Sequence, residues 1–264
     1  MLIVAERINS SRKPINQAVK AKDADFIRAE AKAQAEAGAD YIDVNAGSFI
    51  EQEAEYLCWL VEVVQGVTEL PLCIDSPDPE AIAAALKVVK GSVMLNSISL
   101  EERRMVGMIP LVKKYKTKIV ALCQSDEGMA ATVDDKVKIA EQMVEALTKE
   151  GVALGDIYID PLVYPIATDT QSALAALGAI DRIRQLFPGV HTICGLTNVS
   201  FGLPARKLVN RTFLAAAMSY GLDSAIIDPT DRELMAGLVA AEALLNRDAF
   251  CSGYIKAYRE GKLP

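Results

Sequence analysis

The sequence contains one histidine and few cysteines, and both shortages exclude kinds of site. His191 is the only histidine, so a zinc site built on several histidine ligands is excluded. The five cysteines, at positions 58, 73, 123, 194 and 251, form no C-x-x-C pair, and their odd number argues against a disulfide framework. We therefore expect most of them to be small core residues.

Long apolar runs and an excess of basic charge are also missing. No run reaches the length of a membrane-spanning helix, and the opening MLIVAERINS reaches Glu6 and Arg7 too early for a signal peptide. The formal net charge of −7 opposes binding to nucleic acid or to anionic membranes. We expect a cytoplasmic protein that binds neither nucleic acid nor a membrane.

The chain has enough apolar residues for one large core. Its 264 residues are 51% hydrophobic and 24% charged, and about 250 residues is the usual size of a TIM barrel. No Pro/Ser-rich linker and no shift in composition divides it. The sequence therefore predicts a single domain over residues 1–264.

Short apolar runs alternate with longer segments that have apolar residues at helical spacing. The runs predict strands at 2–6, 41–45, 72–75, 92–96, 118–124, 156–160, 191–198 and 224–228. The longer segments predict helices at 51–65, 79–91, 100–115, 134–150, 171–187, 207–220 and 232–245, and one that closes on Gly38. Eight βα units in series predict an α/β fold, the (β/α)8 TIM barrel.

A polar side chain stands at or near the end of every predicted strand. These residues are Glu6, Asp43, Asn45, Asp75, Asn96, Gln124, Asp160, Asn198 and Asp228. In a TIM barrel the strand ends and the loops after them form the active site. Any one of them, Gln124 and Asp228 above all, has an alternative interpretation as a helix cap or turn residue.

Two features that are common at the active sites of such barrels are missing from the strand ends. No lysine stands there, which argues against Schiff-base chemistry, and the loop DPTDRE after the last strand has no glycine for a phosphate site. The remaining carboxylates and carboxamides fit two kinds of ligand. Asp43, Asp75, Asp160 and Asp228 suit a hard divalent cation, and the same groups suit a flat heterocycle with adjacent N–H donors.

Seven short motifs, in order at the strand ends, resemble those of the pterin-binding barrels. They are AERIN (5–9), DVNAG (43–47), CIDSPDP (73–79), LNS (95–97), YIDPL (158–162), GLTNVSFG (195–202) and VNRTFLAAA (209–217). Within that group the chain is similar to the methyltetrahydrofolate:corrinoid protein methyltransferases and to the folate domain of cobalamin-dependent methionine synthase. The resemblance runs from Met1 to about Tyr254.

The resemblance implies a homodimeric TIM barrel that exchanges the N5-methyl group of 5-methyltetrahydrofolate with a corrinoid (cobalamin). The corrinoid is carried by a partner protein, and this chain itself binds no metal. The implied pterin contacts are Asp75, Asn96, Asp160, Asn198 and Arg206. Among them Asn198 faces N5 and acts in catalysis with Asp75, and Glu6, Asn9, Asp43 and Asn45 support the contacts from behind.

Two rival functions stay open. Dihydropteroate synthase shares the barrel and the pterin pocket, but here the second strand ends in DVNAG and the last in IIDPTD, without that enzyme's Arg-x-His. A noncatalytic folate-binding module is the other rival. The chain has no D-x-H-x-x-G signature for a corrinoid of its own, so it either uses a partner or only binds.

Overall fold

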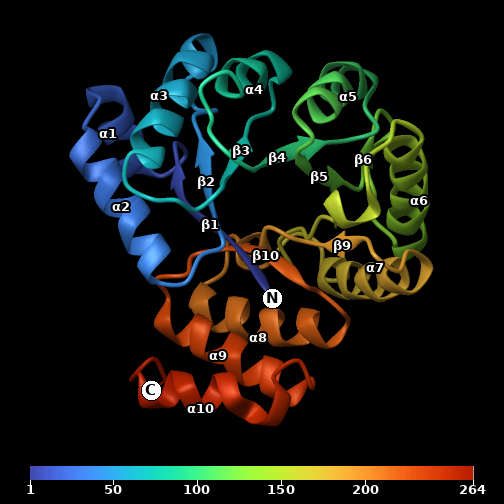
Figure 1. Ribbon diagram of the computed structural model, residues 1–264. Helices are drawn as coiled ribbons and strands as arrows, with labels where there is room; N and C mark the ends of the chain where they lie inside the picture. The colour runs from blue at the N-terminus through green and yellow to red at the C-terminus, as the bar shows by residue number, and fades with distance from the viewer. Residues whose placement is uncertain (264) are drawn as a thin grey trace.

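The computed structural model describes residues 1–263 and has eight parallel strands at its centre (Figure 1). The strands are β1 (Leu2–Asn9), β2 (Tyr41–Asn45), β3 (Leu72–Asp75), β4 (Val93–Ile98), β5 (Lys118–Leu122), β8 (Ile157–Asp160), β9 (His191–Thr192) and β10 (Ser224–Ile227). Their order in the sheet is β10-β1-β2-β3-β4-β5-β8-β9, so neighbours in the sequence are neighbours in space.

The two edge strands of this sheet meet and close it into a barrel. Gly195, just beyond β9, forms a parallel bridge with Ile226 of β10. The backbone N–H of Ile226 donates to the carbonyl oxygen of Cys194 at 2.9 Å. The predicted eight-stranded TIM barrel is therefore confirmed.

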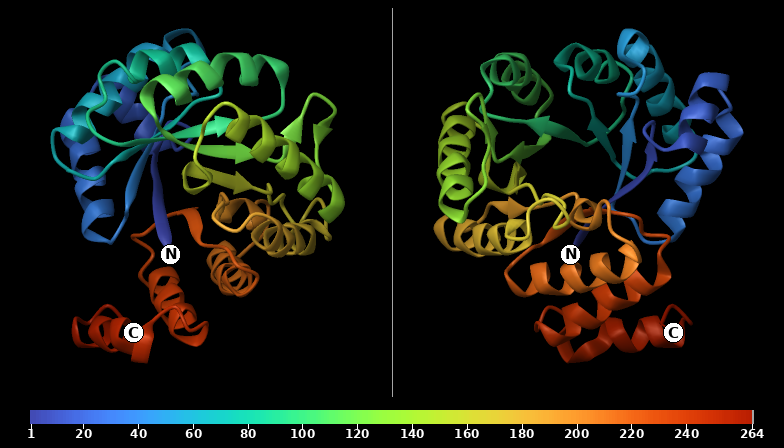
Figure 2. Two further views of the ribbon diagram at one scale, coloured as in Figure 1. Left: turned by 45° about the vertical axis from the view of Figure 1, so that its right-hand side comes forward. Right: turned by 180° about the vertical axis from the view of Figure 1, so that it is seen from behind.

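A helix follows each barrel strand, and the helices surround the strands (Figure 2). They are α2 (Ala24–Glu36), α3 (Glu53–Gln65), α4 (Pro79–Ala85), α5 (Glu102–Tyr115), α6 (Val133–Lys149), α7 (Ser172–Leu186), α8 (Arg206–Ser219) and α9 (Arg232–Leu244). Local sequence starts several of them. The side chains of Asp23, Asp78, Thr132 and Asp231 accept hydrogen bonds from backbone N–H groups in the first turns of α2, α4, α6 and α9.

Two helices lie outside the predicted set. Helix α1 (Lys13–Ala21) precedes α2 in the first βα connection, and α10 (Ser252–Arg259) packs against α9 at the end of the chain. Helix α4 is shorter than predicted, since it ends at Ala85 and turns carry the chain on toward Gly91.

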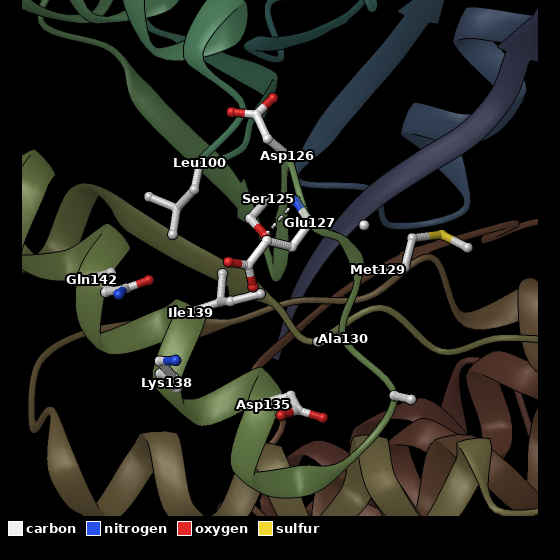
Figure 3. Close-up of a pocket in the computed structure, with 12 residues that line it drawn as sticks. Leu100, Ser125, Asp126, Glu127, Met129, Ala130, Asp135, Lys138, Ile139 and Gln142 are labelled. Atoms are coloured by element: carbon white, nitrogen blue, oxygen red, sulfur yellow. Dashed lines mark hydrogen bonds between the residues drawn. The ribbon is translucent and has the colours of Figure 1, made fainter.

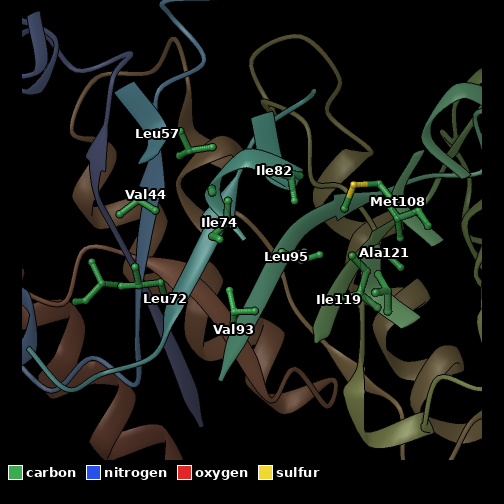
Figure 4. Packing of buried hydrophobic residues seen from close by; sticks show 14 of the residues in the cluster. Val44, Leu57, Leu72, Ile74, Ile82, Val93, Leu95, Met108, Ile119 and Ala121 are labelled. Carbon is green, nitrogen blue, oxygen red and sulfur yellow. The ribbon is translucent and has the colours of Figure 1, made fainter. Parts of the chain in front are cut away.

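The strand side chains alternate between two buried layers, because successive side chains in a strand point to opposite faces. Outward residues of β2 to β5 pack against the helices; Val44, Ile74 and Leu95 with Leu57, Ile82 and Met108 are examples (Figure 4). A separate buried cluster fills the barrel interior. Its members are Val4, Tyr41, Cys73, Met94, Val120, Tyr158 and Ile193.

This alternation sets the position of the polar strand-end residues. Glu6, Asp43, Asp75, Asn96 and Asp160 each stand two residues after a member of the interior cluster. They therefore point inward as well, one layer closer to the C-terminal mouth of the barrel.

Two predicted strands are too long. The run 191–198 forms only the two-residue strand β9, because the chain turns at Gly195 into a 3-10 helix, η3 (Leu196–Ser200). The run 118–124 ends as a barrel strand at Leu122. Gln124 then begins a small antiparallel hairpin of β6 (Gln124–Ser125) and β7 (Gly128–Met129), so it does not end a barrel strand.

Candidate active site

A cavity of about 670 Å³ opens at the C-terminal mouth of the barrel, over the interior cluster. Eight of the predicted site residues line it: Glu6, Asn9, Asp43, Asp75, Asn96, Asp160, Asn198 and Arg206. Sequence reasoning missed other polar residues in its wall, namely Ser11, Arg12, Thr197, Lys207, Asn210 and Asp231. Strand ends thus locate the floor, and loop residues complete the wall.

Asp75 is oriented by a hydrogen bond from Asn45, and Asn45 itself does not line the cavity. Asn45 and Asp75 are register partners on β2 and β3, and Nδ2 of Asn45 donates to Oδ2 of Asp75 at 2.9 Å. Asn45 is fixed in turn, because its Oδ1 accepts from the Ser10 hydroxyl at 3.1 Å and from the Gly47 N–H at 3.0 Å. Burial raises the pKa of Asp75 to about 6, although the Asn45 hydrogen bond lowers it.

Asp43 is the most deeply buried acid of the floor, with 2% of its surface exposed. Its Oδ1 atom has no hydrogen-bond partner within residues 1–263. Burial, followed by the nearby charge of Asp75, raises the pKa of Asp43 well above its ordinary value. Because a buried polar atom without a partner is costly, this oxygen is suited to a ligand in the cavity.

Asp160 lies at the end of β8 and is fixed by the loop that follows. The backbone N–H of Leu162 donates to Oδ1 of Asp160 at 2.7 Å. Burial raises the pKa of this carboxyl to about 6, against the lowering effect of the Leu162 and Gly195 N–H groups and of Lys136. Asp160 is therefore an oriented carboxylate that gains or loses its proton close to neutral pH.

Glu6 on β1 and Asp228 just after β10 both line the cavity and stand close together. Burial, followed by the charge of Asp228, raises the pKa of Glu6 to about 7, and its Oε2 accepts from the Thr197 hydroxyl at 3.3 Å. Asp228 is paired with Arg7 at 3.0 Å and accepts hydrogen bonds from Thr230. Asp228 is thus the turn residue of the alternative interpretation, although it also lines the cavity, and the raised pKa of Glu6 suits proton exchange near neutral pH.

Asn198 reaches the cavity from η3. A Cβ atom at Gly195 would lie 3.0 Å from Nδ2 of Asn198, so the missing side chain of Gly195 leaves space for the carboxamide. Arg206 braces the same turn, because its Nη2 donates to the Thr197 carbonyl at 2.8 Å and its Nε to the Ser200 hydroxyl at 3.0 Å. Its guanidinium also lies over the Phe201 ring at 5.6 Å.

Comparison with known proteins fits this geometry. Residues 5–228 match the family model described as pterin binding enzyme. The chain belongs to this family.

The curated relatives of this pterin-binding enzyme include a full-length match. The chain is 42% identical over 265 residues to a methylcorrinoid:tetrahydrofolate methyltransferase of Eubacterium limosum, covering 100% of this chain and 98% of that protein. It is 33% identical over 240 residues to methionine synthase of Mycobacterium leprae (strain TN). That match covers 86% of this chain and 20% of the much longer synthase.

Solved structures of similar fold include a dihydropteroate synthase of Xanthomonas albilineans in complex with indole-2-carboxylic acid and 6-chloroguanine. It superposes with a TM-score of 0.72 at 19% identity, covering 94% of this chain and 93% of that chain. At this identity the likeness shows the fold alone.

Charge is unevenly distributed within the first cavity. The acids of the floor are buried or half-buried, whereas the cations Arg12, Arg206 and Lys207 lie further out, half-exposed or exposed. Lys207 approaches Asp231 at 3.4 Å. The cavity therefore offers acceptors for N–H groups at depth and positive charge toward solvent.

A second cavity, of about 590 Å³, lies between the β6–β7 hairpin and α6 (Figure 3). Glu127 of the hairpin segment points toward α6, where Lys138, Ile139 and Gln142 line the cavity, whereas Asp126 and Met129 point away from the helix. It shares no lining residue with the first cavity.

Within residues 1–263 no group of three or more His, Cys, Asp or Glu side chains is arranged to hold a metal ion. No helix in the same range combines the length and the apolar character needed to cross a membrane. The prediction that the chain binds no metal stays a prediction.

Proposed function

We propose that this pterin-binding enzyme is a methyltransferase that exchanges the N5-methyl group of 5-methyltetrahydrofolate with the cobalt of a corrinoid on a partner protein. One observation carries the proposal. Asp75, Asn96, Asp160 and Asn198 line one cavity in a chain that matches a methylcorrinoid:tetrahydrofolate methyltransferase over its whole length.

The floor of the cavity supplies groups that complement a pterin ring. A carboxylate accepts two adjacent N–H groups as a bidentate pair, and we assign Asp160 to the 2-amino and N3 protons. A carboxamide both donates and accepts, so Asn96 is assigned to a ring N–H and a ring acceptor. Asp75, oriented by Asn45, completes the ring contacts.

The reaction also needs a proton at N5, because this nitrogen carries the methyl group on one side of the exchange and a hydrogen on the other. The corrinoid supplies the metal centre that holds the methyl group. We assign Asn198 to the hydrogen bond at N5, with Asp75 as the nearby carboxylate that supports proton movement. Glu6, whose pKa of about 7 suits a group that both gives and takes a proton, joins them through its contact with Thr197.

The outer wall suits the remainder of a folate. The glutamate tail of the substrate is anionic, and Arg12, Arg206 and Lys207 provide positive charge where that tail would leave the cavity. The name of the relative from Eubacterium limosum gives a methylcorrinoid as the donor and tetrahydrofolate as the acceptor. N5 must gain a proton when it loses the methyl group and lose a proton when it receives the methyl group, so the same residues serve both directions.

Assembly and location belong to the same proposal. We propose a homodimer, as the sequence resemblance implies, and a cytoplasmic location, as expected from the sequence. Exposed apolar residues near the C-terminus support an interface between copies: Leu244 is 86% exposed, Phe250 99% and Tyr258 69%. Sedimentation of the purified protein at micromolar concentration should give twice the mass of one chain.

Two measurements test the function. Titration calorimetry should show one 5-methyltetrahydrofolate bound per subunit, and no comparable binding of the hydroxymethyl-pterin diphosphate that dihydropteroate synthase requires. Incubation with free cob(I)alamin should then give methylcobalamin and tetrahydrofolate. Binding without any methyl transfer would favour the noncatalytic module, and a stoichiometric, tightly held divalent metal in the purified protein would contradict the pterin assignment of the acids.

A further inference from the structure

One buried charged side chain near the cavity has no part in the proposed chemistry. Lys136 of α6 has none of its surface exposed. Its Nζ donates to three backbone carbonyl oxygens: Ala130 at 2.9 Å, Pro161 at 2.7 Å and Leu162 at 2.9 Å. The ring of Tyr164 lies on a further side, with its centroid 4.8 Å from the nitrogen.

This environment favours the ammonium form of the side chain, although burial lowers the pKa of Lys136 from its ordinary value. An ammonium group has three N–H donors, which matches three carbonyl acceptors, whereas a neutral amine would direct its lone pair at one of them. Burial disfavours a charge, and apolar residues often replace buried charges without loss of stability. A fully buried ammonium with every donor used therefore indicates a function in orienting what it binds.

Lys136 orients the peptide group between Pro161 and Leu162, and this group is hydrogen-bonded to Asp160. The carbonyl of Pro161 and the N–H of Leu162 belong to one peptide unit. Its oxygen accepts a hydrogen bond from Nζ of Lys136, and its N–H donates to Oδ1 of Asp160 at 2.7 Å. Leu162 has a φ of 59°, a conformation that L residues seldom adopt. The hydrogen bond from Lys136 to the Leu162 carbonyl stabilises Leu162 in this conformation.

We infer that Lys136 is a positioning residue for the pterin carboxylate, acting through the Pro161–Leu162 peptide to aim Asp160 at the ligand. The inference rests on the proposed function, because it takes Asp160 as a pterin contact. Hydrogen bonds in series polarise one another, so the peptide passes part of the field of the ammonium to the carboxylate.

The charge of Lys136 has a second effect on Asp160. Burial raises the pKa of this carboxyl to about 6, and Lys136 lowers it. The other titratable groups that interact with the pair are Cys123 after β5, Cys194 after β9, Tyr164 and Asp169 in the loop after β8, and Asp135 on α6. Burial raises the pKa of both thiols and of the Tyr164 hydroxyl, so all three are uncharged near neutral pH. Lys136 is the only cation in this set, and it keeps Asp160 able to accept two N–H groups.

The test is Lys136→Met, which keeps the length of the side chain and removes the charge and the donors. We expect about tenfold weaker binding of 5-methyltetrahydrofolate at pH 7. The pH at which binding is half lost on acidification should rise by about one unit, since Asp160 becomes harder to ionise. Lys138→Met, on the exposed side of the same helix (Figure 3), is the matched control and should leave both values unchanged.

A purely structural lysine predicts a different result. Lys136→Met would then lower the unfolding temperature and leave the pH midpoint of folate binding at its wild-type value, which would overturn the inference. Lys136→Arg keeps the charge and should keep the midpoint, even where tighter packing lowers stability. If the wild-type protein binds no 5-methyltetrahydrofolate, the proposed function fails instead.

Two further measurements apply if Lys136→Met does not fold. Lys136→Gln retains neutral donors without the charge, and we expect the same upward shift of the midpoint. In the unmodified protein labelled with ¹⁵N-lysine, we expect one ammonium resonance whose hydrogens exchange slowly with solvent and which disappears in Lys136→Gln. A neutral amine at this position, or no slowly exchanging resonance, would contradict the geometry on which the inference stands.

Discussion

The two ends of the same barrel use charged residues in opposite ways. At the N-terminal end, Asp223 precedes β10 and pairs with Nδ1 of His191 at 2.8 Å and with Arg184 at 3.0 Å. The ring of Tyr158 stacks on His191 with centroids 4.7 Å apart, and Lys118 donates to the Tyr158 hydroxyl at 3.2 Å. Every charge in this cluster has a partner within the chain.

The pKa shifts record the difference. Burial raises the pKa of Asp223, but the hydrogen bonds from His191 and the Thr192 N–H, together with the charges of His191 and Arg184, outweigh burial, so the pKa lies below its usual range. At the mouth, the pKa values of Glu6, Asp75 and Asp160 are all raised, with burial as the largest cause. The paired charges at the N-terminal end therefore stabilise the fold. The acids at the mouth reduce its stability, but they leave hydrogen-bond acceptors available to a ligand.

The largest expected effect is at the mouth, from Asn198→Ala. A donor at N5 assists the transition state more than the bound substrate, because charge or a proton appears on N5 as the methyl group moves. We expect the rate at saturating folate to fall about 10²–10³-fold, or roughly 3–4 kcal/mol, with a smaller loss of affinity. Single-turnover methyl transfer to cob(I)alamin measures the rate. An unchanged rate would remove Asn198 from the chemical step.

Asp160→Asn should come next in size and affect binding instead of rate. The variant loses a charge-assisted pair and turns amide hydrogens toward ring donors, so folate affinity should fall by about 1.5–3 kcal/mol in calorimetry. Stability should move the other way. A carboxyl with a raised pKa lowers stability as the pH rises from its unfolded value through about 6, so at pH 7 the variant should be as stable as wild type or up to about 2 kcal/mol more stable.

Asp223→Asn tests the opposite end. Its pKa is lowered in the folded state, so its stabilising effect is present above the ordinary aspartate pKa of 3.8 and is lost as the pH falls through the folded value. We expect thermal or urea unfolding at pH 7 to show a loss of about 1–2 kcal/mol, after allowing for partial exposure, and a smaller loss below pH 4. Folate affinity should not change, and a parallel loss of affinity would end the division between the two regions.

The smallest effect is expected from Asn45→Ala, behind the mouth. The change removes the hydrogen bond that orients Asp75 and leaves Asp75 itself in place. Folate binding should weaken by about 0.5–1.5 kcal/mol, the usual contribution of one hydrogen bond. Calorimetry should compare the loss of folate affinity in this variant with the loss in Asp75→Ala. Equal losses in the two variants would mean that Asp75 functions only when Asn45 holds it.

The sequence was sufficient to predict the barrel and the floor of its cavity. Glu6, Asp75 and Asp160 end apolar runs, and period-2 alternation within a strand determines which face they occupy. This prediction uses only residues adjacent in the chain and the regular geometry of parallel strands. It needs no knowledge of how the loops fold.

The wall of the cavity depends on contacts between distant segments, so strand patterns did not predict it. Asn198 and Arg206 were predicted only from the family resemblance, and the other polar wall residues were missed. Thr197 meets Glu6 across 191 positions, and Lys136 meets Leu162 across 26 positions. The run 191–198 looked like one strand because its apolar residues continue, yet the backbone turns at Gly195 and becomes η3. Hydropathy does not record that turn, and it is the turn that directs Asn198 into the cavity.

The closure of the barrel between β9 and β10 has a consequence for local unfolding. Other neighbouring strands share registers of two to four residue pairs, whereas this junction has the single bridge of Gly195 and Ile226. Amide hydrogens on either side of it should exchange with deuterium earlier than those of β2 to β4, because fewer hydrogen bonds must break together. Asn198 is thus attached to the part of the barrel that opens first, and Asp75 and Asn96 to the part that opens last. The proposed contact of Asn198 with N5 can therefore loosen on a different timescale from the proposed ring contacts of Asp75 and Asn96.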